Sequence, residues 1–185
     1  MKSHDRFGPY EVRVVAIDPG GSKFGFAVLE GEDRLIDWGL RKVRKGRKAH
    51  GTRRVIDLLD CYRPDALIVE DVSSKHAGRS PRIRRLVKAV IALGATRGIP
   101  TYSFPRSQIR AAFLQAGAFT KEEIASVVAR RFPALEVRLP PKRRPWMSED
   151  NRINLFEAVA LALTFFDLET KRRETAERDS RLDAS

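Results

Sequence analysis

The chain has 185 residues, 42% of them hydrophobic, which suits one α/β domain with a core rather than two. No stretch approaches the roughly 20 apolar residues that cross a bilayer, and no apolar segment follows the charged first residues, which argues against a membrane span and a secretory signal. Cys61 is the only cysteine, so no internal disulfide can form and a cytoplasmic setting is expected. The net charge of +12 and the pI of about 10.4 are typical of nucleic-acid binders, although an anionic membrane or an acidic protein would also attract this charge.

Three strands are predicted at the start of the chain. Residues 12–18 form a β-branched apolar run that ends at Pro19-Gly20-Gly21, which predicts a strand followed by a tight turn. Residues 23–30 and 34–40 have the alternation of two further strands. The short connections favour an antiparallel meander.

The rest of the chain alternates helices and strands. We expect helix 48–62, strand 66–70, helix 81–97, strand 99–104, short helices at 107–116 and 120–132, and a last helix at about 149–168. Strand 66–70 is apolar up to its final acid, which is typical of a strand buried on both faces. Thr120 and Glu123 have the spacing of a capping box. These elements predict a single domain over residues 1–170 and a charged, flexible C-terminal tail over 171–185, either frayed helix or disordered.

Several acidic residues lie at positions that the predicted fold would bring close together. Asp18 ends the first strand and Glu70 ends the fourth, so parallel neighbouring strands would bring both carboxylates to the sheet edge where α/β folds bind ligands. In the last predicted helix, Asp150, Asn154 and Glu157 are spaced i, i+4, i+7 on one face. Oxygen ligands of this kind suit Mg²⁺ or Mn²⁺, and two such ions about 3.5–4 Å apart can activate water for phosphodiester hydrolysis.

Each acid also has an ordinary structural explanation. Asp18 opens a sequence that is common in turns, Glu70 could be a solvated strand end, and Asp150 could be a favourable acid in a first helical turn. Glu157 differs because it lies among apolar residues, where an unpaired charge would be costly. The metal-site hypothesis therefore depends on the combination.

The same residues resemble the RuvC branch of the ribonuclease H-like nucleases, the Holliday-junction resolvases. The similar segments cover about residues 12–168 and are Val15-Ala16-Ile17-Asp18-Pro19-Gly20-Gly21-Ser22, Leu67-Ile68-Val69-Glu70, Arg97-Gly98-Ile99-Pro100 and Asn154-Leu155-Phe156-Glu157-Ala158. The resemblance implies a ribonuclease H-like fold with a five-stranded mixed sheet, antiparallel in its first three strands and parallel in its last two. It also implies a metal site of Asp18, Glu70 and Glu157, with Asp150 and Asn154 completing the ligands. The family usually has Asp where Glu157 stands, and Asp or His where Asn154 stands.

Basic segments surround the predicted acidic edge. Residues 41–54 and 75–88 contain many Lys and Arg and no acid, and a third basic segment precedes the last helix. Such segments can bind phosphates, and an aromatic side chain among them can stack on a base. The alternative is a solvated surface with a buried tryptophan. The candidate nucleic-acid-binding residues are Lys23, Arg44, Lys45, Arg47, Lys48, Lys75, Arg79, Arg82, Lys142, Arg143, Arg144 and Trp146.

These observations predict an endodeoxyribonuclease that cuts branched or structured DNA with two Mg²⁺ or Mn²⁺ ions and a metal-activated water as the nucleophile. RNA is an alternative substrate, and a homodimer is expected by analogy with the family. Two other functions stay open. The chain could be a ribonuclease H-like module that binds nucleic acid without cutting it, since Asn154 is a neutral ligand, or an actin-like or sugar-kinase-like ATP-binding fragment.

Overall fold

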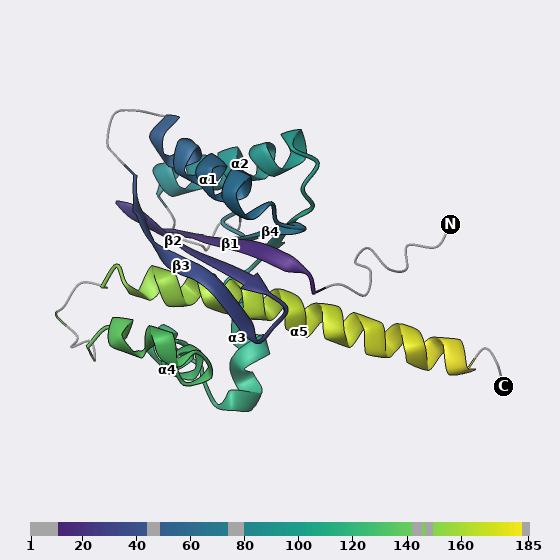
Figure 1. The fold of residues 1–185 in the computed structure, drawn as a ribbon. Coiled ribbons are helices and arrows are strands. Elements are labelled where there is room, and N and C mark those ends of the chain that lie inside the picture. Colours follow the sequence, from purple (N-terminus) through teal and green to yellow (C-terminus); the bar gives the residue numbers. More distant parts are fainter. Residues whose placement is uncertain (1–10, 44–48, 74–79, 142–145, 147–149, 183–185) are drawn as a thin grey trace.

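The fold is built around one five-stranded sheet in the order β3-β2-β1-β4-β5 (Figure 1). The computed structural model describes residues 11–43, 49–73, 80–141, 146 and 150–182. Its strands are β1 (Arg13–Pro19), β2 (Lys23–Glu30), β3 (Arg34–Lys42), β4 (Ala66–Glu70) and β5 (Thr101–Phe104). β1, β2 and β3 pair antiparallel, while β4 is parallel to both β1 and β5. The predicted mixed sheet is confirmed.

Helices cover both faces of the sheet (Figure 1). Their bounds are α1 (Ala49–Tyr62), α2 (Pro81–Thr96), α3 (Arg106–Phe113), α4 (Lys121–Arg131) and α5 (Ile153–Leu182), with 3₁₀ turns η2 (Leu114–Ala116) and η3 (Pro133–Arg138). α1 and α2 pack on one face, whereas α3, α4 and α5 pack on the other. β4 lies between the two layers and is buried throughout, as its apolar sequence predicts.

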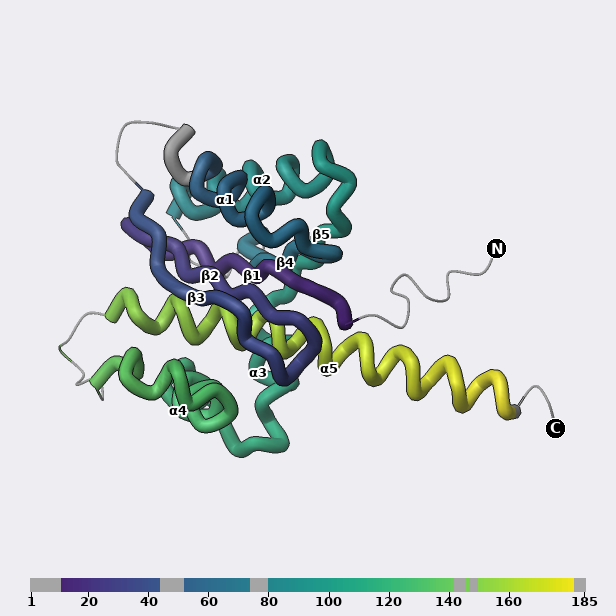
Figure 2. Tube along the Cα trace, in the orientation of Figure 1, coloured from purple at the N-terminus to yellow at the C-terminus, as the bar shows by residue number. Residues whose placement is uncertain are grey.

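The last helix differs from its prediction at both ends. α5 begins at Ile153 rather than near residue 149, because residues 150–152 form a turn in which the backbone N–H of Ile153 donates to the carbonyl of Asp150. The helix continues to Leu182, so described residues of the charged C-terminal segment are helical. The buried N-terminal half of α5 packs along the sheet, and the rest of the helix extends beyond the sheet (Figure 2). No helix in the described part of the chain is long and apolar enough to span a membrane.

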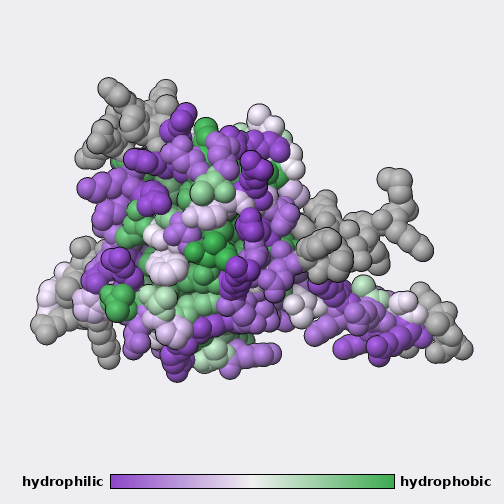
Figure 3. Space-filling view, viewed as in Figure 1, coloured by the Kyte–Doolittle hydropathy of each residue, from purple (hydrophilic) through white to green (hydrophobic). Residues whose placement is uncertain are grey.

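The other helices agree well with their local sequence signals. Thr120 caps α4 through the N–H of Glu123, and the Glu123 carboxylate accepts from the backbone N–H of Thr120, so the predicted capping box is confirmed. η3 was not predicted. β3 is an edge strand with half-buried side chains. Figure 3, in the orientation of Figure 1, shows apolar side chains in the middle of this face of the molecule and hydrophilic side chains around them.

Candidate active site

Two buried carboxylates lie side by side where β1 and β4 end. The strands pair in parallel up to the residues that precede Asp18 and Glu70, so these two acids occupy the next adjacent positions. Ala16 and Ile68, two residues earlier on each strand, belong to the core beneath α5, and side chains alternate along a strand. Asp18 and Glu70 therefore face α5, and they are only 3% and 6% exposed. The sequence-based placement of both acids at one sheet edge is confirmed.

The first turn of α5 lies against the same edge. A Cβ added at Gly25, which pairs with Asp18 across β1 and β2, would be 1.9 Å from the backbone oxygen of Asn154. A Cβ at Gly20 would be 1.9 Å from the side-chain nitrogen of Asn154. Only glycine leaves room for this approach. The predicted ligand Asn154 is therefore packed directly against the residues around Asp18.

Glu157, one turn further along α5, is 2% exposed and pairs with two cations. Its Oε2 contacts the guanidinium of Arg106 and lies 3.8 Å from Nζ of Lys121. Arg106 is the first residue of α3, and Lys121 is the first residue of α4. An unpaired charge at this buried position would be costly, and the structure supplies it with partners from two other helices.

Asp150 is not on the helix face with Asn154 and Glu157, so that prediction is wrong. It precedes α5, and its carboxylate accepts hydrogen bonds from Arg152, at 2.7 Å from Nη2 and 2.8 Å from the backbone nitrogen. The Arg152 hydrogen bonds, helped by the positive charges of Arg152 and Lys23, hold the pKa of Asp150 below its usual value. Asp150 is thus an ionised acid whose oxygens are already bound by a neighbouring guanidinium.

The donor chemistry at this edge fits a divalent cation. Asp18 and Glu70 supply adjacent carboxylates away from solvent, where like charges repel unless a cation lies near them. Glu157 Oε1 is also buried, and it has no hydrogen-bond partner among the described residues. Within those residues, however, no group of three or more His, Cys, Asp or Glu side chains is placed so that it could hold a metal ion. Asp18 and Glu70 are the core of the candidate site, and Glu157 borders it.

Two of the described nucleic-acid candidates, Lys23 and Arg82, lie near this edge. Lys23 begins β2 and is close enough to Asp150 to lower its pKa. Arg82, in the first turn of α2, donates to the backbone oxygen of Val43 just beyond β3. Trp146 is 76% exposed, which agrees with a contact surface and not with a buried anchor. Outside the described residues lie Arg44, Lys45, Arg47, Lys48, Lys75, Arg79, Lys142, Arg143 and Arg144.

Sequence reasoning missed Arg106 and Lys121. The sequence does contain a signal for Arg106. It lies two residues after β5, so it could have been predicted at the same sheet edge as the ends of β1 and β4. Lys121 follows the Thr120 cap, and nothing in its local pattern distinguishes it from a solvated helix residue. Its contact with Glu157 depends on how α4 packs on α5.

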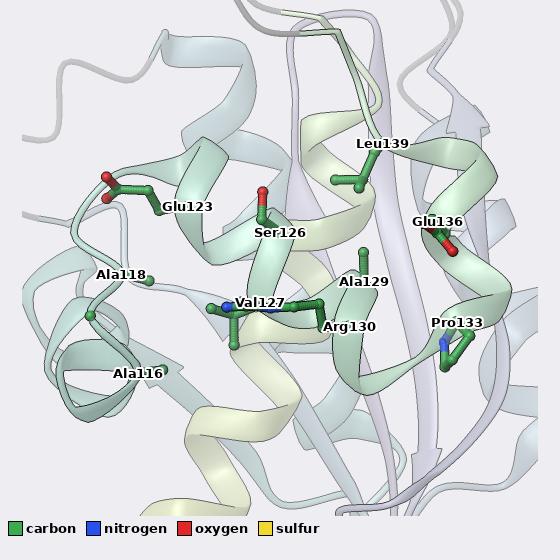
Figure 4. Close-up of a pocket in the computed structure, with 11 residues that line it drawn as sticks. Ala116, Ala118, Glu123, Ser126, Val127, Ala129, Arg130, Pro133, Glu136 and Leu139 are labelled. Atoms are coloured by element: carbon green, nitrogen blue, oxygen red, sulfur yellow. The ribbon is translucent and has the colours of Figure 1, made fainter.

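A cavity of about 450 Å³ lies between the η2–α4 turn, α4 and η3, and neither Asp18, Glu70 nor Glu157 lines it (Figure 4). Its lining includes Glu123, Ser126, Arg130 and Glu136. Glu123 is already engaged by the capping box of α4, through hydrogen bonds that lower its pKa. Among the described residues, none of the predicted site residues lines this cavity, so it is not part of the candidate active site.

Comparisons with known proteins agree on one family. Residues 14–145 match the family model described as crossover junction endodeoxyribonuclease RuvC. The chain is 32% identical over 141 residues to the Streptomyces avermitilis protein of that description, covering 71% of this chain and 78% of the relative. The Thermus thermophilus RuvC structure superposes with a TM-score of 0.64 at 25% identity, covering 86% and 96% of the two chains. A second structure, of T. thermophilus RuvC in complex with a Holliday junction substrate, has the same TM-score and coverage at 23% identity and so supports the fold.

Proposed function

Since the chain belongs to the RuvC family of crossover junction endodeoxyribonucleases, we propose that it is an endonuclease that hydrolyses phosphodiester bonds in branched DNA with a divalent metal ion. One observation carries the proposal. Asp18 and Glu70 are buried at adjacent positions on the parallel strands β1 and β4 and face the same helix. A core packed without polar groups would be less costly at this place, so the two acids are better explained by chemistry than by stability.

The proposed roles follow from position. Asp18 and Glu70 hold the ion, Mg²⁺ or Mn²⁺, with Glu157 Oε1 and the side-chain oxygen of Asn154 as the neighbouring donors on α5. A bound divalent ion supplies positive charge that activates water and stabilises the leaving oxygen. Lys121, partly exposed beside Glu157, contributes positive charge at the rim of the acidic edge, where a phosphate would approach.

Branched DNA is the proposed substrate. The relative from T. thermophilus has been determined with a Holliday junction, and the net charge of +12 favours a polyanionic ligand. Two described residues next to basic segments have contacts toward the acidic edge. The backbone N–H of Val43 donates to the carbonyl of Ser22, which follows β1, and Asp150 lies close enough to Lys23 for the lysine charge to lower its pKa. A homodimer is proposed from the family, because two cuts in a symmetric junction need two sites.

The test is cleavage of labelled DNA by the purified chain. A four-way junction, a duplex and a single strand, together with RNA, are incubated with Mg²⁺, Mn²⁺ or EDTA. We expect the junction to be cut with metal and to stay intact in EDTA. Asp18→Asn and Glu70→Gln should each abolish cleavage while junction binding remains. The matched control is Asp33→Asn, in the turn between β2 and β3 at the opposite edge of the sheet, with an exposed carboxylate that pairs with Arg131.

Two results would count against the proposal. Unchanged cleavage by Asp18→Asn would remove the acidic edge from the reaction. Junction binding without cleavage by the wild-type chain would favour a non-cutting module, the second candidate function. The pairing of Glu157 with Arg106 supports this second candidate, since that carboxylate is engaged by a guanidinium. The ATP-binding alternative has no comparable observation in its favour.

A further inference from the structure

A groove of about 530 Å³ lies between α1 and β3, the edge strand of the sheet. Its lining includes Arg41 and Lys42, at the end of β3, and Arg54, in the second turn of α1. β3 and β1 run in the same direction, because each is antiparallel to β2. The end of β3 therefore lies at the same edge of the sheet as Asp18, and the basic residues of the groove begin there.

Two lysines at this end of the sheet repel each other. Lys23 of β2 and Lys42 of β3 are directly opposite, and like charges at such positions destabilise a sheet. Lys42 forms no ion pair with any described residue. The acid whose pKa Lys23 lowers, Asp150, is itself bound by Arg152. A bound anion would relieve this repulsion, so the lysine pair is better explained by a ligand than by stability.

Arg41 is held in place without being neutralised. Its guanidinium carbon lies 4.6 Å from the ring centroid of the buried Phe26. The side chain is exposed, and it forms no ion pair within the part of the chain that the structure describes. A cation–π contact orients a guanidinium but leaves its N–H donors available. Arg41 can therefore donate to the oxygens of a phosphate, which a guanidinium often binds in pairs.

The two acids that line the groove already have partners. Asp37 accepts a hydrogen bond of 2.7 Å from the hydroxyl of Tyr62, and this bond raises the pKa of Tyr62 so that the phenol keeps its proton. Asp57 lies 3.2 Å from Nε of Arg53. Among the described residues, these two negative charges are set against four positive ones, those of Arg41, Lys42, Arg53 and Arg54. The groove therefore favours an anion.

The register of the strands gives the distance from the acidic edge to the groove. Asp18 pairs with Gly25, and Gly25 pairs with Leu40, which lines the groove. Two strand spacings thus separate Asp18 from Leu40, which amounts to about 10 Å. The phosphates of one DNA strand follow each other about every 3.4 Å along the duplex axis, so about three nucleotides span this distance.

We propose that this groove binds the phosphates of the DNA strand that leads away from the cleavage position, starting about three nucleotides from the cut. Leu40 packs against the core beneath α5, so Lys42, two residues later, shares the sheet face of Asp18, whereas Arg41 lies on the face of α1. These two side chains lead from the acids into the groove, where Arg54 follows. The inference rests on the proposed function for DNA as the ligand and for the cut at Asp18.

The first measurement is the salt dependence of junction binding. A labelled four-way junction is titrated in EDTA, which prevents cutting, at several salt concentrations. Each phosphate contact contributes about 0.9 to the slope of log K against log salt, so the slope of the triple variant Arg41→Gln/Lys42→Gln/Arg54→Gln should be shallower by about 2.7. The charge-keeping variant Arg41→Lys/Lys42→Arg/Arg54→Lys should retain the wild-type slope.

A matched control separates the groove from the net charge of the chain. Arg130→Gln/Arg138→Gln/Arg173→Gln removes three exposed positive charges from α4, η3 and α5, which pack on the other face of the sheet. Its slope should stay within about 0.5 of the wild type, because none of these residues lines the groove. Circular dichroism and urea unfolding establish that each variant is folded before its binding is measured.

The second measurement finds the phosphates that the groove contacts. A methylphosphonate, which has no charge, replaces one phosphate at a time along each strand of the junction. At about 0.1 M salt, neutral linkages about three to five nucleotides from the cut should each weaken wild-type binding about 5- to 10-fold. The Arg41→Gln/Lys42→Gln/Arg54→Gln variant should no longer respond at these positions.

An unchanged slope in that variant would overturn the inference, and so would an equal change in the control variant or sensitive phosphates that persist without the three cations. Failure of the wild-type chain to bind any junction would overturn both this inference and the proposed function. A shallower slope and a cluster of sensitive phosphates that the variant loses, without cleavage by the wild type, would support the groove while refuting the nuclease. The two proposals can therefore fail separately.

Discussion

Replacing Gly25 with alanine should push the first turn of α5 away from the sheet. The new Cβ would be 1.9 Å from the backbone oxygen of Asn154, 2.3 Å from its carbonyl carbon and 2.7 Å from the nitrogen of Leu155. Ordinary contact begins at 3.4 Å, so a gap of about 1.5 Å must open. All three obstructing atoms are backbone, and no change of rotamer can relieve the clash.

The cost follows from the packing of α5. Inserting a methyl group into a filled core typically costs about 1–3 kcal/mol, and the upper end applies here because a buried helix has to move. We expect a loss of about 3 kcal/mol, which for a chain of this size lowers the midpoint of thermal unfolding by about 6–12 °C. The same shift moves Asn154 and Glu157 relative to Asp18, and misplacement by about 1 Å can reduce catalysis about 100-fold.

Urea unfolding followed by circular dichroism measures the first effect, and junction cleavage measures the second. Gly21→Ala is the matched control, since its Cβ would meet nothing within 4 Å and its backbone needs no special conformation. Its free energy of unfolding should stay within about 0.5 kcal/mol of the wild type. If Gly25→Ala unfolds at the wild-type urea concentration, the close approach of α5 to β2 is wrong. Lower stability with unchanged cleavage would show that α5 does not contribute to the site.

Three further predictions concern other parts of the molecule. Thr120→Ala should cost about 1 kcal/mol in urea unfolding because the N–H of Glu123 loses its cap, whereas Thr120→Ser should cost little; an equal loss in both would contradict the cap. The hydrogen bond from Arg13 lowers the pKa of Glu30, so the stabilisation by the ionised carboxylate is present at neutral pH and is lost as pH falls through the folded pKa. The difference in free energy of unfolding between wild type and Glu30→Gln should therefore shrink below pH 4.5, and a difference that stays constant with pH would argue against the ion pair. Trp146→Ala should leave the urea midpoint unchanged, because the side chain is 76% exposed, and should weaken junction binding about 5- to 150-fold if the indole stacks on a base.

Local patterns in the sequence were sufficient for most of the fold. Alternation and β-branched runs predicted the strands, and β2 and β4 have the predicted bounds, since the period of two also determines which residues face the core. The positions of Asp18 and Glu70 followed from the same reasoning. Parallel strands end at one edge, so an acid at the end of each was expected to meet the other. These features depend on short-range geometry, which the sequence carries directly.

Such local patterns do not predict which residues of different helices come into contact. Helical spacing placed Asp150 beside Asn154 and Glu157, but the helix begins three residues later than Asp150, where Arg152 holds that acid in a turn. Helical periodicity shows which face of α5 Glu157 occupies, and it contains no information on the residue that another helix brings opposite. Arg106 meets Glu157 only because α3 follows β5 and packs beneath α5. The sequence by itself determined where the acids gather, whereas tertiary packing decided which of them are neutralised by the chain's own cations.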